Sequence, residues 1–195
     1  MRSFSRPATI TALLACTACL GPREDTSAFF LLSPAPPQSA SAPMTTTVGL
    51  GPIALPGYLD RAQMVMRLSD YQIALSESDR WAEPLADNLQ RTLEENLAVL
   101  LPGASFIAYP WYPSETPDHA VSITFRRFET NAIGVAVLDA TWELMTDGTR
   151  VDGRATRIEE TAVAPDRASA VAAQSRTLAR LSEEIATAIR RSSGR

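Results

Sequence analysis

Lysine is missing from this chain of 195 residues, in which all 18 basic residues are arginines. The 22 acidic residues outnumber them, and the formal net charge is −4. A domain that binds nucleic acid ordinarily carries a basic patch or stripe that neutralises phosphates. We therefore expect no nucleic acid among the partners of this chain.

Cysteine and histidine are almost absent. The only cysteines are Cys16 and Cys19, which excludes a disulfide framework in the rest of the chain. The single histidine, His119, cannot supply the several ligands of a metal site. No serine lies in a nucleophile elbow, and no glycine-rich phosphate loop follows a predicted strand. The sequence therefore predicts no catalytic residues, no metal and no cofactor, and we expect that the protein is not an enzyme.

The N-terminus has the pattern of a secretory signal peptide. Arg2 and Arg6 provide the positive charge, and the uncharged stretch 8–15 that follows is mostly apolar. This stretch is too short to span a bilayer, which takes about 20 apolar residues. The sequence therefore predicts export from the cytoplasm.

Two cysteines compete for the role of a lipid anchor. The segment Leu13-Leu14-Ala15-Cys16 resembles the lipobox of bacterial lipoproteins, in which a peptidase cuts after a small residue and the cysteine sulfur carries a diacylglyceryl group. Cys16 is favoured because leucine stands three residues before it and alanine directly before it. Cys19 is the alternative, because Ala18 precedes it. We expect residues 1–15 to be the signal peptide, 16–27 the anchor and spacer, and 28–195 one folded domain.

Hydrophobic periodicity predicts ten elements in that domain. The expected strands cover residues 29–32, 48–55, 64–68, 71–75, 105–108, 120–128, 134–145 and 150–162. The expected helices cover 83–101 and 167–191, each with an apolar stripe at helical spacing. Asp166 is a candidate N-cap, and Asp147-Gly148 is a candidate hairpin turn. We predict an α+β fold with a single domain, in which two amphipathic helices pack on a mainly antiparallel sheet.

Two segments combine an aromatic ring, an acid and an arginine within a few residues. The first motif is Leu55-Pro56-Gly57-Tyr58-Leu59-Asp60-Arg61, and the second is Asp79-Arg80-Trp81-Ala82-Glu83-Pro84-Leu85. Such groups can pair with one another inside the domain, where an arginine stacks on the ring and bonds to the carboxylate. They can also form a surface for a partner. Both interpretations stay open at the level of the sequence.

These motifs also carry a resemblance to a known family. The segment Val48-Gly49-Leu50-Gly51-Pro52, the two motifs and the stretch 88–101 resemble the PqiC/YmbA family, whose members are auxiliary lipoproteins of ABC-type and MCE transport systems. Segments 29–32, 109–111 and 138–142 also fit this family. The residues that match its two motifs are Tyr58, Leu59, Asp60, Arg61, Arg80, Trp81, Glu83 and Pro84.

The resemblance implies an outer-membrane lipoprotein that faces the periplasm. Its partners would be an MCE-domain protein and the permease and ABC components of the inner membrane, on which it would dock while lipids move between the membranes. Neither Thr17 nor Leu20, which follow the two candidate anchors, is the aspartate associated with retention in the inner membrane. The covalent lipid would be the only non-protein group.

Three further possibilities remain open. The domain could itself carry a lipid, since the stretch 109–112 is rich in aromatic residues. It could instead be a structural envelope lipoprotein without a role in transport. A docking subunit could also form a homo-oligomer, although no residue spacing establishes one.

Overall fold

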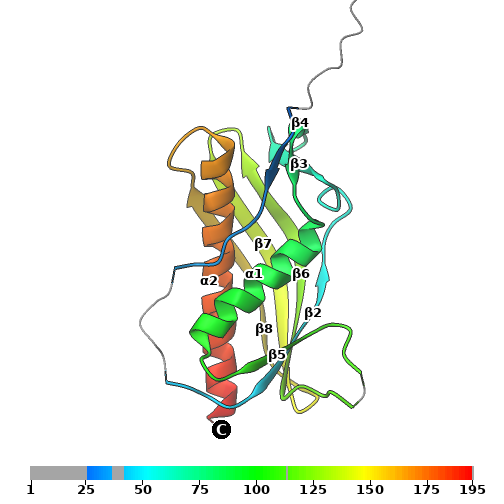
Figure 1. The fold of residues 1–195 in the computed structure, drawn as a ribbon, viewed down its shortest axis with the longest axis vertical. Helices are drawn as coiled ribbons and strands as arrows, with labels where there is room; N and C mark the ends of the chain where they lie inside the picture. Colours follow the sequence, from blue (N-terminus) through cyan, green and yellow to red (C-terminus); the bar gives the residue numbers. More distant parts are fainter. Residues whose placement is uncertain (1–25, 37–41, 113, 195) are drawn as a thin grey trace, which may run out of the picture.

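A computed structural model of the protein describes residues 26–36, 42–112 and 114–194. The predicted signal peptide and the two candidate anchors, Cys16 and Cys19, lie outside these residues. Each of the ten predicted elements has a counterpart (Figure 1). The strands are β1 (Ala28–Phe30), β2 (Thr47–Ala54), β3 (Gln63–Arg67), β4 (Ile73–Trp81), β5 (Ser105–Ala108), β6 (His119–Asn131), β7 (Val135–Thr146) and β8 (Thr149–Thr161), and the helices are α1 (Leu85–Leu100) and α2 (Arg167–Ser193).

The three longest strands form an antiparallel meander. β6 pairs with β7, and β7 pairs with β8. Asp147 and Gly148 connect β7 to β8 with φ values of +48° and +73°. Positive φ at both central residues matches the right-handed twist of the flanking strands, which confirms the predicted hairpin turn.

The rest of the sheet is largely parallel, so the expectation of a mainly antiparallel sheet is wrong. β2 runs parallel to both β5 and β6, β3 runs parallel to the end of β6, and β1 runs parallel to β4. The eight strands therefore form one mixed sheet. For β5 the cause is α1, which carries the chain back along the sheet so that β5 pairs parallel to β2. Such a crossover gives a parallel pair, whereas a short turn gives an antiparallel pair.

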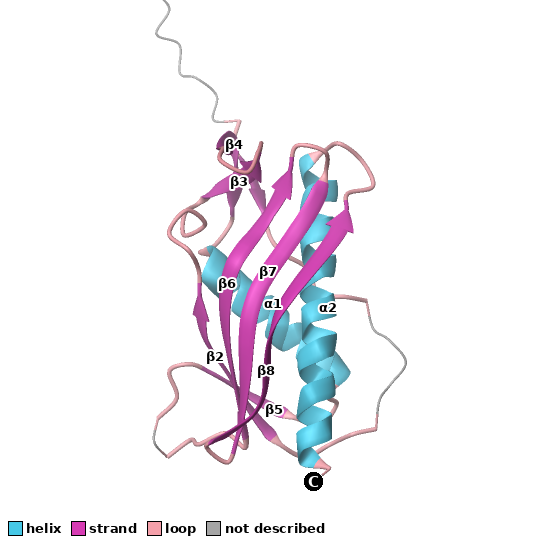
Figure 2. Ribbon diagram, turned by 180° about the vertical axis from the view of Figure 1, so that it is seen from behind, coloured by secondary structure: helices cyan, strands magenta, loops and turns pink. Residues whose placement is uncertain are grey.

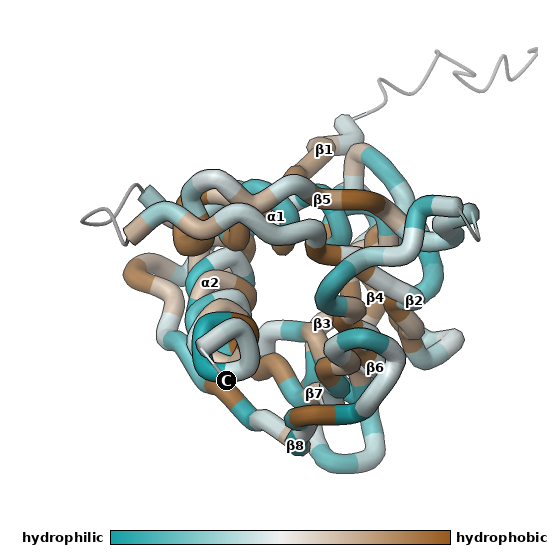
Figure 3. Tube along the Cα trace, turned by 90° about the horizontal axis from the view of Figure 1, so that it is seen from below, coloured by the Kyte–Doolittle hydropathy of each residue, from teal (hydrophilic) through white to brown (hydrophobic). Residues whose placement is uncertain are grey.

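Both helices cover the same face of the sheet, as Figures 1 and 2 show from opposite sides. In Figure 3, α1 and α2 lie along one side of the molecule and β6, β7 and β8 along the other. The leucine stripe of α1 and the apolar stripe of α2 meet Phe125 and Trp142 of the sheet in one core. The side chains of Leu89, Leu93 and Leu97 have no exposed area. This confirms that both stripes pack in the core.

The two helices differ in how their N-termini are capped. Asp166 accepts a hydrogen bond of 2.7 Å from the backbone N–H of Ser169, which confirms it as the N-cap of α2. α1 begins two residues later than predicted, after Pro84, which makes no side-chain cap bond. No helix in the described ranges is both long and apolar enough to cross a membrane.

Candidate functional site

The two motifs lie next to each other because β3 and β4 pair. Gln63, just after the first motif, pairs with Arg80, and the backbone N–H of Trp81 donates to the carbonyl oxygen of Ala62 at 2.8 Å. Leu59 and Trp81 are 2% and 5% exposed and belong to the same core. The structure thus joins two segments that are well separated in the sequence.

Tyr58 of the first motif reaches a buried carboxylate. Its hydroxyl donates to Oε2 of Glu129 at 2.8 Å. Oε1 of the same carboxylate accepts from Nε of Arg67 at 2.6 Å and from Nε of Arg127 at 2.9 Å. The Glu129 side chain has no exposed area, while Arg67 and Arg127 are 19% and 25% exposed. One carboxylate therefore holds the first motif, β3 and β6 together; we call this the Glu129 cluster.

Burial and hydrogen bonding oppose each other at this carboxylate. Burial raises the pKa of Glu129, but the hydrogen bonds from Arg67, Tyr58 and Arg127 together lower it by a larger amount. The pKa therefore lies below its ordinary value. The pKa of Tyr58 is raised, first by burial and then by its bond to the carboxylate. At neutral pH the cluster therefore holds an ionised glutamate and a protonated tyrosine, and it has no acid–base group poised for proton transfer.

Glu83 of the second motif forms a more exposed cluster on α1. Its Oε1 accepts from Nη2 of Arg91 at 2.9 Å, and Arg91 also reaches Oε1 of Glu95 at 3.2 Å. The side chains of Glu83 and Arg91 are 31% and 38% exposed. Nη2 of Arg91 further donates to Oδ1 of Asn88 at 3.1 Å. We call these residues the Glu83 cluster.

Two asparagines that the sequence reasoning did not single out fasten the segment after β1. Oδ1 of Asn88 accepts from the N–H of Leu32 at 3.2 Å, and Oδ1 of Asn96 accepts from the N–H of Ala35 at 2.8 Å. Both asparagines are buried on α1, and Nδ2 of Asn96 lies 3.3 Å from Oγ of Ser182 on α2. The sequence does mark these two asparagines, because they are polar residues on the leucine-bearing face of a predicted helix.

The remaining motif residues face the surface. Asp60 and Pro84 are exposed, and Arg61 and Arg80 are half-buried. Nη2 of Arg61 lies 3.5 Å from the carbonyl oxygen of Gly57, and Nε of Arg80 lies 3.4 Å from Oγ of Ser27. These are long contacts, so they fix the two arginines only weakly.

Two glycines ahead of the first motif make room for the aromatic loop that follows β5. A Cβ on Gly49 would stand 2.6 Å from Cγ of Pro117 and 2.9 Å from Cζ3 of Trp111. A Cβ on Gly51, whose φ is +121°, would stand 2.6 Å from Cβ of Tyr109. A larger residue at either position would push this loop off β2. The aromatic stretch is therefore packed against the strand at two points.

His119 is buried at the start of β6 and bonds to hydroxyl groups. Nδ1 lies 2.8 Å from Oγ1 of Thr146, and Nε2 lies 2.9 Å from Oγ of Ser193 on α2. Burial lowers the pKa of His119, against the opposing influence of Asp118 and Asp147. Across the described ranges no three residues among His, Cys, Asp and Glu are grouped so that they could hold a metal ion.

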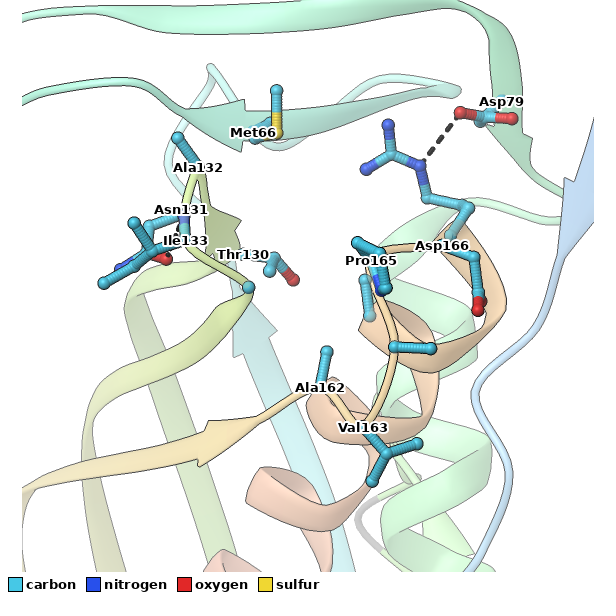
Figure 4. A pocket seen from close by; sticks show the side chains of 14 residues that line it. Met66, Asp79, Thr130, Asn131, Ala132, Ile133, Ala162, Val163, Pro165 and Asp166 are labelled. Atoms are coloured by element: carbon cyan, nitrogen blue, oxygen red, sulfur yellow. Dashed lines mark hydrogen bonds and ion pairs between the residues drawn. The ribbon is translucent and has the colours of Figure 1, made fainter.

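The surface has two notable hollows. An apolar groove of about 400 Å³ runs between residues 30–36 and α2, with Phe30, Leu31, Val171 and Ala172 in its walls. A more polar hollow of about 530 Å³ lies at one end of the sheet, between the β6–β7 turn and the start of α2. Figure 4 shows this second hollow with the ion pair between Asp79 and Arg167 in its wall.

Comparison with known proteins identifies the domain. Residues 30–186 match the model of a family described as the ABC-type transport auxiliary lipoprotein component. The chain belongs to this family. The match begins in β1 and ends within α2, so it spans nearly all of the folded domain.

The curated relatives carry a more specific name. The chain is 26% identical over 96 residues to the intermembrane transport lipoprotein PqiC of Escherichia coli strain K12, and equally to that of Shigella flexneri. The aligned part is 49% of this chain and 50% of each relative, so the chain spans about half the length of the curated relatives it matches.

Two solved structures share the fold. A crystal structure of an uncharacterised protein superposes with a TM-score of 0.71 at 24% identity, over 84% of this chain and 99% of the other. A protein from Xanthomonas campestris superposes with the same TM-score of 0.71 at 15% identity, over 87% and 100% of the two chains. These likenesses concern the fold alone.

Proposed function

We propose that this member of the auxiliary lipoprotein family is a non-enzymatic accessory subunit of an ABC/MCE-type system for lipid transport between membranes. It would be anchored in the outer membrane by a lipid on Cys16, or alternatively on Cys19, and would face the periplasm. It would act by docking on an MCE-domain protein and on the permease and ABC components of the inner membrane.

The observation that carries this proposal is the family match over residues 30–186. Two curated relatives, 26% identical to this chain over 96 residues, are named intermembrane transport lipoproteins. In both motif clusters the glutamate is engaged in an ion pair with arginine.

We also propose that the two motifs serve chiefly to hold the domain together. Tyr58, Leu59, Trp81 and Glu83 all direct their side chains to the core or to a polar cluster. Asp60, Arg80 and Pro84, which are more exposed, could add to a partner surface without being needed for folding.

Co-purification tests the proposed function. The full-length lipoprotein, tagged at its C-terminus, is extracted from membranes in mild detergent and the captured proteins are identified. We expect an MCE-domain protein together with its permease. Capture of neither, from cells that express both, would contradict the proposal.

Two further experiments address the anchor and the oligomeric state. A Cys16→Ser chain that still incorporates palmitate would move the anchor to Cys19. Light scattering on the purified protein would reveal a homo-oligomer.

A second candidate function is a periplasmic lipid carrier. The observation that favours it is the apolar groove between residues 30–36 and α2, with its walls of Phe30, Leu31 and Val171. Native mass spectrometry after mild extraction would reveal a bound phospholipid or acyl chain. Loss of that lipid in an Ala172→Asp chain, changed at an exposed position in the wall of the groove, would support the carrier, whereas a wild-type chain that is always empty would contradict it.

A further inference from the structure

Three connections lie side by side at the end of the molecule where the described chain begins (Figure 1). They are the β3–β4 turn at 68–72, the β6–β7 turn at 132–134 and the β8–α2 connection at 162–166. The N–H of Ala132 donates to the carbonyl oxygen of Arg67 at 3.0 Å, which joins the first two. The N–H of Ala162 donates to the carbonyl oxygen of Gly134 at 2.8 Å, which joins the second to the third.

Each of these connections exposes a large apolar side chain. Tyr71 is 99% exposed, Ile133 is 82% exposed and Val163 is 85% exposed. Among the described residues, only these three large apolar side chains are more than four-fifths exposed. A single exposed apolar side chain is ordinary, but three on neighbouring turns call for an explanation. Together with Leu68, which is 41% exposed, we call them the apolar tip.

The apolar tip surrounds hollows and does not fill them. Ile133 and Val163 both line the hollow of about 530 Å³, and Figure 4 shows them on different sides of it. Leu68 and Ile133 line a neighbouring hollow of about 340 Å³. Leu68, Ile133 and Val163 therefore border two adjoining hollows, and Tyr71 stands fully exposed on the same turn as Leu68. The exposed parts of these side chains gain burial only from something outside the domain.

The charges around this rim are balanced within the protein. The arginines that line the two hollows are each held by a carboxylate: Arg67 and Arg127 by Glu129, Arg157 by Glu159, and Arg167 by Asp79. Asp70 and Asp166 add two acids, and Asp166 accepts a bond at the start of α2. Charge attraction therefore contributes little to binding at this end, and the exposed apolar side chains are what a partner would bury.

The length of chain before the domain indicates what that surface is. Thr26, the first described residue, follows Cys16 by ten positions and Cys19 by seven. A fully extended chain covers at most about 3.6 Å per residue, so either anchor keeps Thr26 within about 36 Å of the lipid. β1 begins two residues later, at Ala28, beside Asp79, which lines the larger hollow. The anchored bilayer, whose acyl chains lie just beneath the headgroups, is thus the apolar phase that this end of the domain meets at high effective concentration.

We propose that the apolar tip docks into the interfacial region of the phospholipid bilayer that holds the lipid anchor. Tyr71, Ile133 and Val163 enter the boundary between headgroups and acyl chains, where binding strengthens with the apolar area that is buried. This inference rests on the lipid anchor of the proposed function. Docking fixes the orientation of the domain, so that the opposite end, with Tyr112 and the Asp147-Gly148 turn, points away from the membrane.

Tryptophan scanning in proteoliposomes tests the proposal. The full-length lipidated protein is reconstituted into vesicles of phosphatidylethanolamine and phosphatidylglycerol, with and without brominated phospholipids, which quench tryptophan emission on contact. Ile133→Trp and Val163→Trp are the reporters. Tyr112→Trp is the matched control, because Tyr112 is a 73% exposed aromatic residue on the loop at the opposite end.

We expect the emission added by Trp at 133 and 163 to shift to shorter wavelength and to be lost in brominated vesicles. The emission added at 112 should stay at long wavelength and remain unquenched. Quenching should persist in about 1 M salt, where the Debye length is only about 3 Å. If the reporters at 133 and 163 are quenched no more than the control at 112, the apolar tip does not dock on lipid and a protein partner must cover it.

Flotation of the same vesicles separates this inference from the proposed function. A wild-type protein that does not float with the vesicles has no lipid anchor, which would contradict the proposed function itself. A protein that floats while its reporters stay unquenched keeps its anchor and overturns only the docking of the apolar tip. The reporters sit at highly exposed positions, so we expect them to leave the unfolding transition unchanged.

Discussion

Each of the two motifs contributes one side chain to an ion-pair cluster, but the surroundings of the two clusters are very different. In the Glu129 cluster, which Tyr58 of the first motif joins, the carboxylate has no exposed area and bonds to two arginines and a tyrosine. In the Glu83 cluster of the second motif, the carboxylate is 31% exposed and its partner Arg91 is 38% exposed. The same pairing chemistry should therefore contribute very different amounts to stability.

This comparison indicates that burial determines how much an ion pair contributes to the stability of this domain. A buried carboxylate that loses its hydrogen bonds leaves uncompensated charge in a medium of low dielectric constant, which is costly. A half-exposed pair is screened by water and salt, and its loss is nearly neutral. Substitutions in the two clusters should therefore fall in a clear order, from a large loss of stability at Glu129 to a small one at Glu83.

Removal of the buried carboxylate should have the largest effect. Glu129→Ala leaves Arg67 and Arg127 without their shared counter-charge, and breaking a buried pair in this way costs about 3–5 kcal/mol. Urea unfolding of the purified lipoprotein measures the change. A loss below about 1 kcal/mol, the range of a surface pair, would mean that the cluster does not hold the first motif.

Removal of the tyrosine hydroxyl should cost less. Tyr58→Phe keeps the ring, which lies 5.9 Å from the Arg67 guanidinium carbon, and loses only the hydroxyl with its hydrogen bond to Glu129. A hydrogen bond to a charged group contributes about 1.5–3 kcal/mol. The same unfolding assay measures it, with Tyr71→Phe as the matched control at a fully exposed tyrosine. Equal stability of both variants would contradict the role of the hydroxyl.

Acid should remove the contribution of Glu129 from the wild type. The pKa of Glu129 lies below its ordinary value, so its stabilising effect is present above the unfolded pKa of about 4.3 and is lost as pH falls through the folded pKa. We therefore expect the stability difference between wild type and Glu129→Gln to shrink as the pH is lowered below about 4. A difference that stays constant across this range would show that Glu129 is not ionised in the folded protein.

Disruption of the exposed pair should have the smallest effect. Glu83→Gln keeps the shape of the side chain and removes its charge opposite Arg91. An exposed pair contributes about 0.2–1 kcal/mol, and raised salt should reduce the difference further. Thermal unfolding at low and high salt measures both. A cost as large as that of Tyr58→Phe would erase the contrast between the two clusters.

Much of the fold follows from local pattern in the sequence. The leucines at 85, 89, 93 and 97 recur at helical spacing, and the structure buries all four. Asp166 and the Asp147-Gly148 pair are local signals whose geometry is decided within a few residues, and both were predicted. The α+β class follows from the order of these elements.

Pairing between distant segments could not be predicted in this way. No local pattern indicates that β4 continues from Leu75 to Trp81, because those residues become a strand by pairing with β1 on one side and β3 on the other. The parallel pairing of β2 with β5 depends on α1 as a crossover. Glu129 lies 71 residues from Tyr58, so only the folded chain reveals their contact.

A paired assay of one variant separates the two interpretations of the motifs most directly. The Tyr58→Phe lipoprotein is assayed in parallel for its free energy of unfolding and for the MCE-domain protein that its folded fraction captures from solubilised membranes. If the first motif holds the domain together, the free energy of unfolding falls while capture equals that of the wild type. Unchanged stability with lost capture would contradict this role and would make the first motif a partner surface.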